Sequence, residues 1–326
     1  MTTLVHRPRS ETPGAPAHIH KGSWRRGRLI AAGAVLCALV MAAHSAVPNV
    51  FGNPGSLLET FLPWLGLSVP VLLALAAVRR SATAAVAVLL PAVAWCALFG
   101  GVLMDKRADG GDLTVVSHNV NDANPDPVGT AHQLAAARPQ LLALEELTPH
   151  TAPTYERALA AGYPYHSVQG TVGLWSTYPL RDVRPVAIMP WTRALRATAD
   201  TPKGPVAVYV AHLASVRVLP AVGFTTARRD EAAGRLADAV RAEPLPRVVV
   251  VGDFNGSTGD RALGPVTSQL RSAQDEAGDG FGFSWPAAFP VARIDQILLK
   301  GITPVSSWTL PRTGSDHLPV AAALRL

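Results

Sequence analysis

The chain has 326 residues, of which 48% are hydrophobic and 16% are charged, and its formal net charge is +6 at pH 7. Residues 1–103 hold eight basic and two acidic residues, so the rest of the chain, with 21 of each, is neutral. Nucleic-acid-binding domains usually carry a basic surplus, because phosphate contacts dominate their affinity. The charge balance therefore disfavours a dedicated nuclease, although it leaves a local basic groove open.

The amino-terminal third predicts a tail followed by membrane spans. Residues 1–28 are rich in Pro, His, Thr and Arg without periodicity, which predicts a disordered basic cytoplasmic tail. Within residues 29–104, each of three apolar runs is about 19 residues or longer, which suffices to cross a bilayer. A cleavable signal peptide is the alternative for the first run, which basic residues precede. The three predicted transmembrane helices are Leu29–Val47, Leu57–Val78 and Ala82–Met104.

The basic residues near the spans predict their orientation. Six precede the first span, Arg79 and Arg80 separate the second from the third, and Pro48–Ser56 has none. This pattern places the amino terminus and the Arg79-Arg80 turn in the cytoplasm, whereas Lys106 and Arg107 argue mildly for the reverse. We therefore expect a multi-pass protein of the cell membrane whose carboxy-terminal domain is extracytoplasmic.

A polar linker at residues 105–111 leads into a domain at residues 112–326, where strand-like and helical segments alternate. This mixture predicts an α/β sandwich of two packed sheets with helices outside. The predicted helices are Pro127–Ala137, Tyr155–Ala161 and Thr225–Glu243. The predicted strands are Thr114–Asn119, Leu141–Glu146, Tyr165–Val168, Gly173–Ser176, Arg184–Ile188, Val206–His212, Val248–Asp253, Gln296–Leu299 and Ala321–Leu326.

Short polar motifs stand at the ends of apolar runs in this domain. Together they supply Asn, Glu, His and Asp side chains. Carboxylates suit a hard divalent cation, and histidines with partner carboxylates suit phosphate stabilisation and proton transfer. The six motifs are Val115–Asn119, Leu141–Glu146, Val208–His212, Val248–Asn255, Arg293–Ile297 and Ser315–Val320.

These motifs, in this order, resemble the endonuclease/exonuclease/phosphatase superfamily, over about residues 112–326. The resemblance implies a DNase I-like four-layered α/β/β/α sandwich and a phosphohydrolase that depends on Mg²⁺ or Mn²⁺. It implies a metal site formed by Asn119, Glu146 and Asp316. It further implies catalytic roles for His212, Asp253, Asn255, Asp295 and His317.

The same resemblance suggests what the catalytic residues do. Asp253 would orient or deprotonate the attacking water, while Asn255 and His212 would bind the phosphoryl group. Asp295 would hold His317 in a protonated, oriented form that stabilises the charged transition state.

The sequence departs from the family pattern at two positions. Glu145 stands where relatives have Gln, which leaves open whether Glu145 or Glu146 faces the ion. Thr177 stands where relatives often have the Arg of a Ser-Arg-x-Pro motif, which puts any substrate contact from that Arg in doubt.

Membrane spans before such a domain resemble the VanJ-type teicoplanin-resistance membrane phosphatases of actinomycetes. This resemblance implies a lipid-linked pyrophosphate substrate, such as undecaprenyl pyrophosphate, and a role in glycopeptide resistance or cell-wall lipid recycling. The short linker independently favours a substrate in the lipid bilayer, because it keeps the site close to the head groups. The alternatives are an extracellular membrane-tethered nuclease and a catalytically inactive binding module. No obligate protein partner is evident from the sequence.

Overall fold

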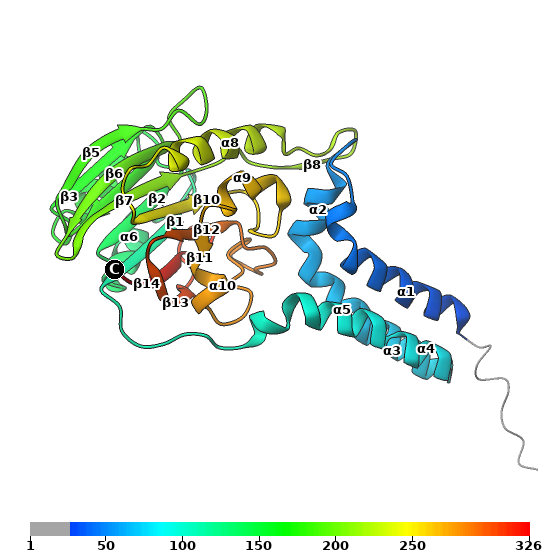
Figure 1. The fold of residues 1–326 in the computed structure, drawn as a ribbon. Coiled ribbons are helices and arrows are strands. Elements are labelled where there is room, and N and C mark those ends of the chain that lie inside the picture. The colour runs from blue at the N-terminus through cyan, green and yellow to red at the C-terminus, as the bar shows by residue number, and fades with distance from the viewer. Residues whose placement is uncertain (1–26) are drawn as a thin grey trace, which may run out of the picture.

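The computed structural model of the protein describes residues 27–326, which form a bundle of apolar helices joined to a sandwich of two β-sheets (Figure 1). The tail predicted over residues 1–28 lies, up to residue 26, outside the described residues. The helices of the bundle lie between residues 28 and 103, and the first strand of the sandwich begins at Leu113.

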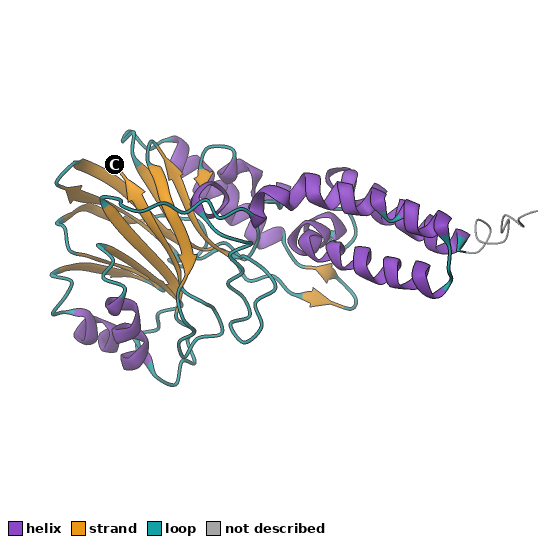
Figure 2. Cartoon of the chain, turned by 90° about the horizontal axis from the view of Figure 1, so that it is seen from below, coloured by secondary structure: helices purple, strands orange, loops and turns teal. Residues whose placement is uncertain are grey.

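The bundle contains three helical passes that extend away from the sandwich, and each pass runs antiparallel to the one before it (Figures 1 and 2). The amino end of the first pass and the Arg79-Arg80 turn share the far end of the bundle, because Gly27 lies directly against Ser81. The first pass is α1 (Arg28–Ala42) and the 3-10 helix η1 (His44–Ala46). The second is α2 (Pro54–Phe61), η2 (Leu62–Leu67) and α3 (Ser68–Val78). The third is α4 (Ala82–Ala87), α5 (Leu89–Phe99) and η3 (Gly100–Leu103).

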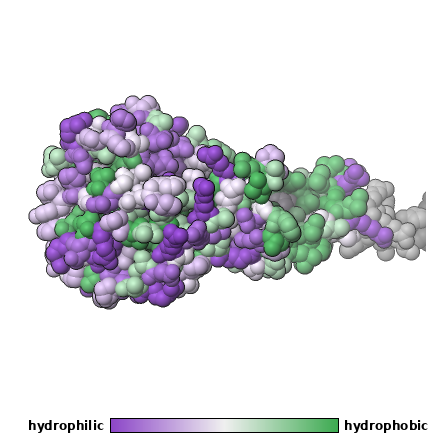
Figure 3. Space-filling model, turned by 90° about the horizontal axis from the view of Figure 1, so that it is seen from above, coloured by the Kyte–Doolittle hydropathy of each residue, from purple (hydrophilic) through white to green (hydrophobic). Residues whose placement is uncertain are grey.

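Two helical segments of the described chain are long and apolar enough to cross a membrane, Pro54–Val78 and Ala82–Leu103. The prediction of three such helices is therefore corrected to two within residues 27–326. The predicted span Leu29–Val47 is interrupted, since α1 ends at Ala42 after 15 residues, a length of about 22 Å. That is shorter than the hydrocarbon core of a bilayer, which is about 30 Å thick. Hydrophobic surface nevertheless gathers on the bundle, whereas the sandwich surface is mixed and more hydrophilic (Figure 3).

The sandwich consists of two six-stranded mixed sheets (Figure 2). The first sheet has the strand order β13 (Thr303–Thr309), β14 (Val320–Arg325), β1 (Leu113–Asn119), β2 (Leu141–Glu145), β4 (Val172–Ser176) and β3 (Tyr165–Gln169). The second has the order β11 (Arg271–Ser272), β12 (Asp295–Lys300), β10 (Val248–Asp253), β7 (Gly204–Ala211), β6 (Ala194–Thr201) and β5 (Leu180–Pro185). A small hairpin pairs β8 (Val218–Leu219) with β9 (Gly223–Phe224).

Helices cover the outer faces of both sheets. Successive residues of a strand point to opposite faces, so Val249 packs in the core between the sheets while its neighbour Val250 packs outward. The first sheet is covered by α6 (Pro127–Ala136) and α7 (Ala152–Leu159), and the second by α8 (Ala227–Arg241) and α9 (Gly264–Thr267). The remaining helices are η4 (Arg261–Leu263) and α10 (Ala273–Ala277). This arrangement confirms the predicted α/β/β/α sandwich.

The structure contains strands that the sequence pattern did not predict, notably β6, β13 and the hairpin β8–β9. Strand β6 was missed because Arg196 interrupts its apolar pattern, although this side chain is buried in the structure. The Arg196 guanidinium reaches Glu243 of the α8 end with N–O distances of 2.9 and 3.0 Å. Tyr209 also donates to Glu243, at 2.7 Å. A buried charge with such partners is tolerated inside a sheet.

A polar cluster joins the bundle to the sandwich. The Arg261 guanidinium lies 3.2 Å from the buried Glu59 carboxylate, and the Arg261 main-chain N–H donates to the same carboxylate. Arg261 also donates to the main-chain carbonyls of Ser45 and Val47. Nearby, the Ser56 hydroxyl donates to Asp260 at 2.9 Å. The loop that follows β10 is thereby attached to the first and second passes of the bundle.

Candidate active site

The predicted polar residues converge because their strands end at one edge of the sandwich. β1 and β2 are parallel, with Asn119 opposite Glu145, and β10 runs parallel to β7. β12 runs antiparallel to β10, so that Asp295 lies directly opposite Asp253. Carboxyl ends of parallel strands share a sheet edge, which is where α/β proteins commonly bind ligands.

A glycine permits the close approach of two of these strand ends. Gly252 has a φ of +136°, and a Cβ at this position would lie 1.9 Å from the carbonyl oxygen of Ala211. Only glycine fits such a conformation and contact. Gly252 therefore brings the end of β10, with Asp253, against the end of β7, with His212.

Asp253 is at the centre of the cluster and is 2% exposed. Its carboxylate accepts hydrogen bonds from Asn119 Nδ2 at 3.1 Å and from the main chain of Asn255 at 2.8 Å. Burial raises the pKa of Asp253, and the charge of Asp295 adds to the effect, whereas the charge of His317 opposes it. A carboxylate with a raised pKa is suited to accept a proton near neutral pH.

His317 and Asp295 form a buried pair. The Nδ1 atom of His317 lies 2.9 Å from one Asp295 oxygen, and its Nε2 atom lies 3.9 Å from Asp253. Burial lowers the pKa of His317, but the charge and hydrogen bond of Asp295 outweigh it and raise the pKa to about 10. The imidazole is therefore cationic at neutral pH, and His317 lines the pocket described below.

The two adjacent glutamates occupy different environments. Glu145 is fully buried beneath the site, where Ser117 donates to it at 3.0 Å, and burial raises its pKa well above the ordinary value. Glu146 is half-exposed and has a φ of +62°, a left-handed conformation that is uncommon outside Gly, Asn and Asp. This reversal turns the Glu146 carboxylate toward the pocket, 3.6 Å from His212 Nε2. Of the pair, Glu146 is the one placed to meet a ligand.

His212 is 1% exposed and lies between Glu146 and Asp253, at 3.6 and 3.5 Å from their carboxylates. Burial lowers its pKa well below the ordinary value, and the charge of Arg193 adds to this effect. Both ring nitrogens lack a hydrogen-bond partner among the described residues. Because buried polar groups are rarely left unsatisfied, His212 is positioned to bond a group that enters the site.

Asp316 lies at the rim of the cluster rather than in its buried centre. Asn121 donates to one of its oxygens at 2.8 Å, and Trp285 donates to the other at 3.4 Å. Sequence reasoning predicted Asp316 but missed these two partners. An Asn in the turn after β1 and a lone Trp in a loop carry no motif that could have identified them.

The donor set fits a divalent cation. Within residues 27–326, Asp253, Asp295 and His317 each place a possible ligand atom within 4.8 Å of the others, but His317, cationic and bonded to Asp295, contributes charge rather than a lone pair, which leaves the carboxylates as the metal ligands. This group differs from the predicted set, in which Asn119 is already engaged with Asp253. Glu146 and Asp316 line the same pocket. Such an excess of carboxylate oxygens suits a hard cation such as Mg²⁺ or Mn²⁺ without selecting one ion.

A pocket of about 560 Å³ opens over these residues, and we call it the head pocket. Glu146, Asp253, Asn255, Asp316 and His317 line its polar floor. Its wall is mainly apolar and comes from residues to which sequence reasoning assigned no role in the site. These wall residues include Thr60 and Phe61 of α2, Val218 and Leu219 of β8, Phe224 and Trp285.

Thr177, the residue that departs from the family's Arg, lies away from the site. Strand β4 runs antiparallel to β2, with Val172 opposite Glu145 and Ser176 opposite Leu141. Thr177 therefore follows the end of β4 that is remote from Glu145. This substitution does not change the head pocket.

Comparison with known proteins agrees with this geometry. Residues 116–317 match the model of the Endonuclease/Exonuclease/phosphatase family. A search of curated proteins finds no match. Among solved structures, the chain is similar to D. rerio TDP2 complexed with a single-strand DNA product, with a TM-score of 0.56, 18% identity, and coverage of 66% of this chain and 99% of that chain.

Two further structures illustrate the range of proteins with this fold. The mannosyl-6-phosphatase of Bacteroides thetaiotaomicron has a TM-score of 0.54 at 16% identity, covering 66% of this chain and all 100% of that chain. The beta toxin of Staphylococcus aureus has a TM-score of 0.53 at 14% identity, covering 65% and 99%. At such identities the likeness shows the fold alone. Because the family model spans more than half of the sequence, the chain belongs to the endonuclease/exonuclease/phosphatase family.

Proposed function

We propose that the protein is a membrane-anchored, metal-dependent phosphohydrolase that removes phosphate from a lipid-linked pyrophosphate, such as undecaprenyl pyrophosphate. The observation that carries this proposal is the composition of the head pocket. Its floor holds the family's carboxylates and histidine, and its wall includes Thr60 and Phe61 of a segment that continues into an apolar helix long enough to cross a membrane. A phosphate head group would meet the floor while its lipid stays beside the helices.

The residues of the floor divide the chemistry among them. Glu146 and Asp316, with Asn119 nearby, are proposed to hold Mg²⁺ or Mn²⁺. When bound, the ion polarises the phosphoryl oxygens and stabilises the charge that develops on them. Asp253 is central and buried and has a raised pKa, which suits it to orient water and take its proton.

Binding and charge stabilisation fall to the remaining residues. The neutral His212 has unpartnered nitrogens and can donate to a phosphoryl oxygen. The Asn255 amide, which bonds Asp253 and the carbonyl of Leu213, lies at the same floor. Cationic His317, held by Asp295, supplies positive charge opposite the oxygens of the transition state.

We further propose that the sandwich lies outside the cytoplasm. Arg79, Arg80 and the amino end of α1 share the end of the bundle remote from the sandwich, and basic residues favour the cytoplasmic side. An alkaline phosphatase fused to the carboxyl end should be active, and a fluorescent protein that folds only in the cytoplasm should be dark. The reverse pattern would exclude a substrate at the outer face.

Nuclease activity is the second candidate function, because the fold is shared with a DNA-bound TDP2. The head pocket disfavours it, since Arg217 is the only Lys or Arg among the described residues that line it. Purified protein should release phosphate from undecaprenyl pyrophosphate faster than it cleaves plasmid DNA, and its expression should raise tolerance to teicoplanin. Efficient DNA cleavage that weakens steeply with salt, without pyrophosphatase activity, would overturn the proposal.

A further inference from the structure

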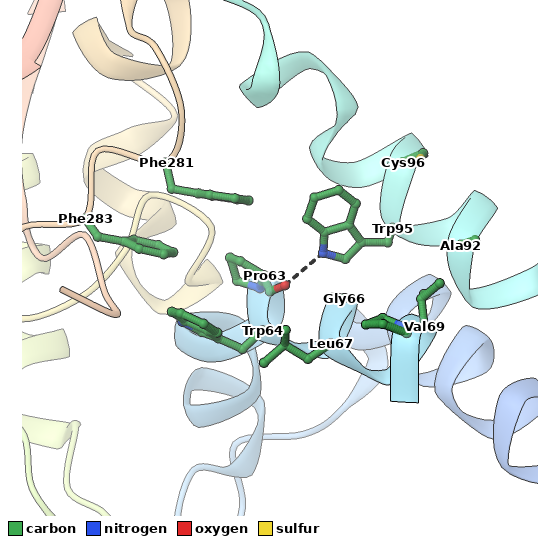
Figure 4. A pocket seen from close by; sticks show the side chains of 11 residues that line it. Pro63, Trp64, Gly66, Leu67, Val69, Ala92, Trp95, Cys96, Phe281 and Phe283 are labelled. Carbon is green, nitrogen blue, oxygen red and sulfur yellow. Dashed lines mark hydrogen bonds between the residues drawn. The ribbon is translucent and has the colours of Figure 1, made fainter. Parts of the chain in front are cut away.

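A second cavity lies in the bundle next to the head pocket. This apolar groove has a volume of about 460 Å³, within the range of small-ligand sites. Its walls are η2 and α3 on one side, α5 on the other, and the loop segment at residues 281–283 of the sandwich. Figure 4 shows the aromatic side chains of Trp64, Trp95, Phe281 and Phe283 around it.

The groove is preformed and offers apolar surface. Trp95 Nε1 donates to the carbonyl of Pro63 at 2.8 Å, and Trp64 Nε1 donates to the carbonyl of Val291 at 2.7 Å. Both indole N–H groups are therefore satisfied, which leaves the rings to form apolar walls. Gly66 leaves space for one of them, since a Cβ there would lie 2.4 Å from Trp95 Nε1.

Three short chain segments connect the groove with the head pocket, because residues close together in each segment belong to the two cavities. Phe61 lines the head pocket and Pro63 lines the groove, only two residues later in the same helical segment. Phe283 lines the groove and Trp285 the head pocket. The carbonyl that anchors Trp64 belongs to Val291, next to Ala292 of the head pocket. The two cavities are thus adjacent: the head pocket has a polar floor, and the groove is lined almost entirely by apolar surface.

We propose that the groove binds the hydrocarbon chain of the lipid phosphate whose head group occupies the head pocket, an inference that rests on the proposed function. The outer faces of the same helices are exposed and apolar, for example at Leu73 and Val93. In a bilayer they contact lipid tails, so a chain can pass from the membrane into the groove without crossing water. Burial of apolar chain surface there favours binding in proportion to its area.

A pair of matched substitutions tests this site. Ala92 lines the groove, whereas Ala97 is exposed on the same helix and lines neither cavity. Ala92→Trp fills the groove and is expected to raise KM for undecaprenyl pyrophosphate about tenfold, equivalent to about 1.4 kcal/mol of binding. It should leave KM for the short geranyl pyrophosphate within about twofold, since a short chain leaves most of the groove empty. Ala97→Trp should change neither value, and equal losses on both substrates in Ala92→Trp would overturn the proposal.

Crosslinking separates this inference from the proposed activity and does not depend on the folding of a variant. A diazirine on one of the prenyl units nearest the pyrophosphate of a long-chain substrate should label wild-type peptides that contain Trp95 or Phe281–Phe283, because these units would occupy the groove of about 460 Å³ beside the head pocket. Absence of hydrolysis with labelling of these peptides would refute the proposed function and retain the groove. Hydrolysis with labels confined to the outer faces, such as Leu73, would retain the function and refute the groove.

Discussion

The bundle and the sandwich distribute their apolar residues in opposite ways. In the bundle, Val93 is 67% exposed while Ser81 is 3% exposed, whereas in the sandwich Leu142 and Val250 are fully buried. An outward apolar surface is stable only against an apolar surrounding. This difference agrees with the proposed membrane anchorage of the bundle, and the head pocket is lined by residues of both parts. A substrate that is half polar and half apolar matches such a position.

Removal of the metal ion should give the largest difference between the two parts, because it affects the site in the sandwich and leaves the bundle unchanged. EDTA is expected to reduce phosphate release to background, because the carboxylates of the floor then repel the phosphate without a cation. The helix content measured by circular dichroism should not change, since the candidate ligands lie at strand ends and in loops of the sandwich rather than in its helices. Activity should return with Mg²⁺ or Mn²⁺. Full turnover in EDTA would show that the site works without a metal.

Substitution of single carboxylates tests the polar floor. Glu146→Gln and Asp253→Asn should each reduce turnover by on the order of 10²-fold or more, as for the loss of a positioned catalytic group. Glu145→Gln is the matched control, because burial already favours the neutral form of Glu145. Steady-state rates on one lipid substrate compare the three. Normal activity in Glu146→Gln with loss in Glu145→Gln would reverse our choice of carboxylate.

The stability of the sandwich should also depend on a buried ion pair. Glu243→Gln weakens a fully buried pair with Arg196, and we expect it to destabilise the sandwich by about 2–3 kcal/mol at pH 7. Burial raises the pKa of Glu243, but the bonds from Arg196 and Tyr209 outweigh it and lower the pKa.

The sign of the pH dependence follows from that lowered pKa. The contribution of Glu243 is present above the pKa of an unfolded Glu, about 4.3, and is lost as the pH falls through the folded value. Thermal unfolding of the solubilised protein should therefore show a difference between wild type and Glu243→Gln that shrinks below about pH 4. A difference that is independent of pH would assign the loss to packing.

The attachment between the two parts should give the smallest effect. Arg261→Gln breaks a partly exposed pair with Glu59 and should reduce turnover of a lipid substrate a few-fold, since such pairs contribute about 1 kcal/mol. Arg235→Gln, which removes an exposed pair with Glu231 on α8, serves as the control and should behave as wild type. Equal rates in the two variants would show that the pair does not help to orient the pocket.

The sequence predicted the floor of the head pocket but not its wall. Each floor residue stands at the end of an apolar run or in a motif, and parallel strands place such ends together. Phe61 and Trp285 reach the pocket only through packing between segments that are distant in the sequence, for which no local pattern exists. Strand β6 was missed for a related reason. An Arg in a sequence predicts an exposed position, and the burial of Arg196 becomes understandable only once its partner Glu243 is known.

The left-handed backbone at Glu146 has a consequence for engineering. A non-glycine residue in this conformation is disfavoured by roughly 1–2 kcal/mol, so Glu146→Gly is expected to relieve local strain. A library of variants selected only for thermal stability should then be enriched in Gly or Asn at position 146. Each such variant should lack catalytic activity, because it has lost the Glu146 carboxylate. The strained backbone at position 146 is thus a site where selection for stability and selection for catalytic activity favour different residues.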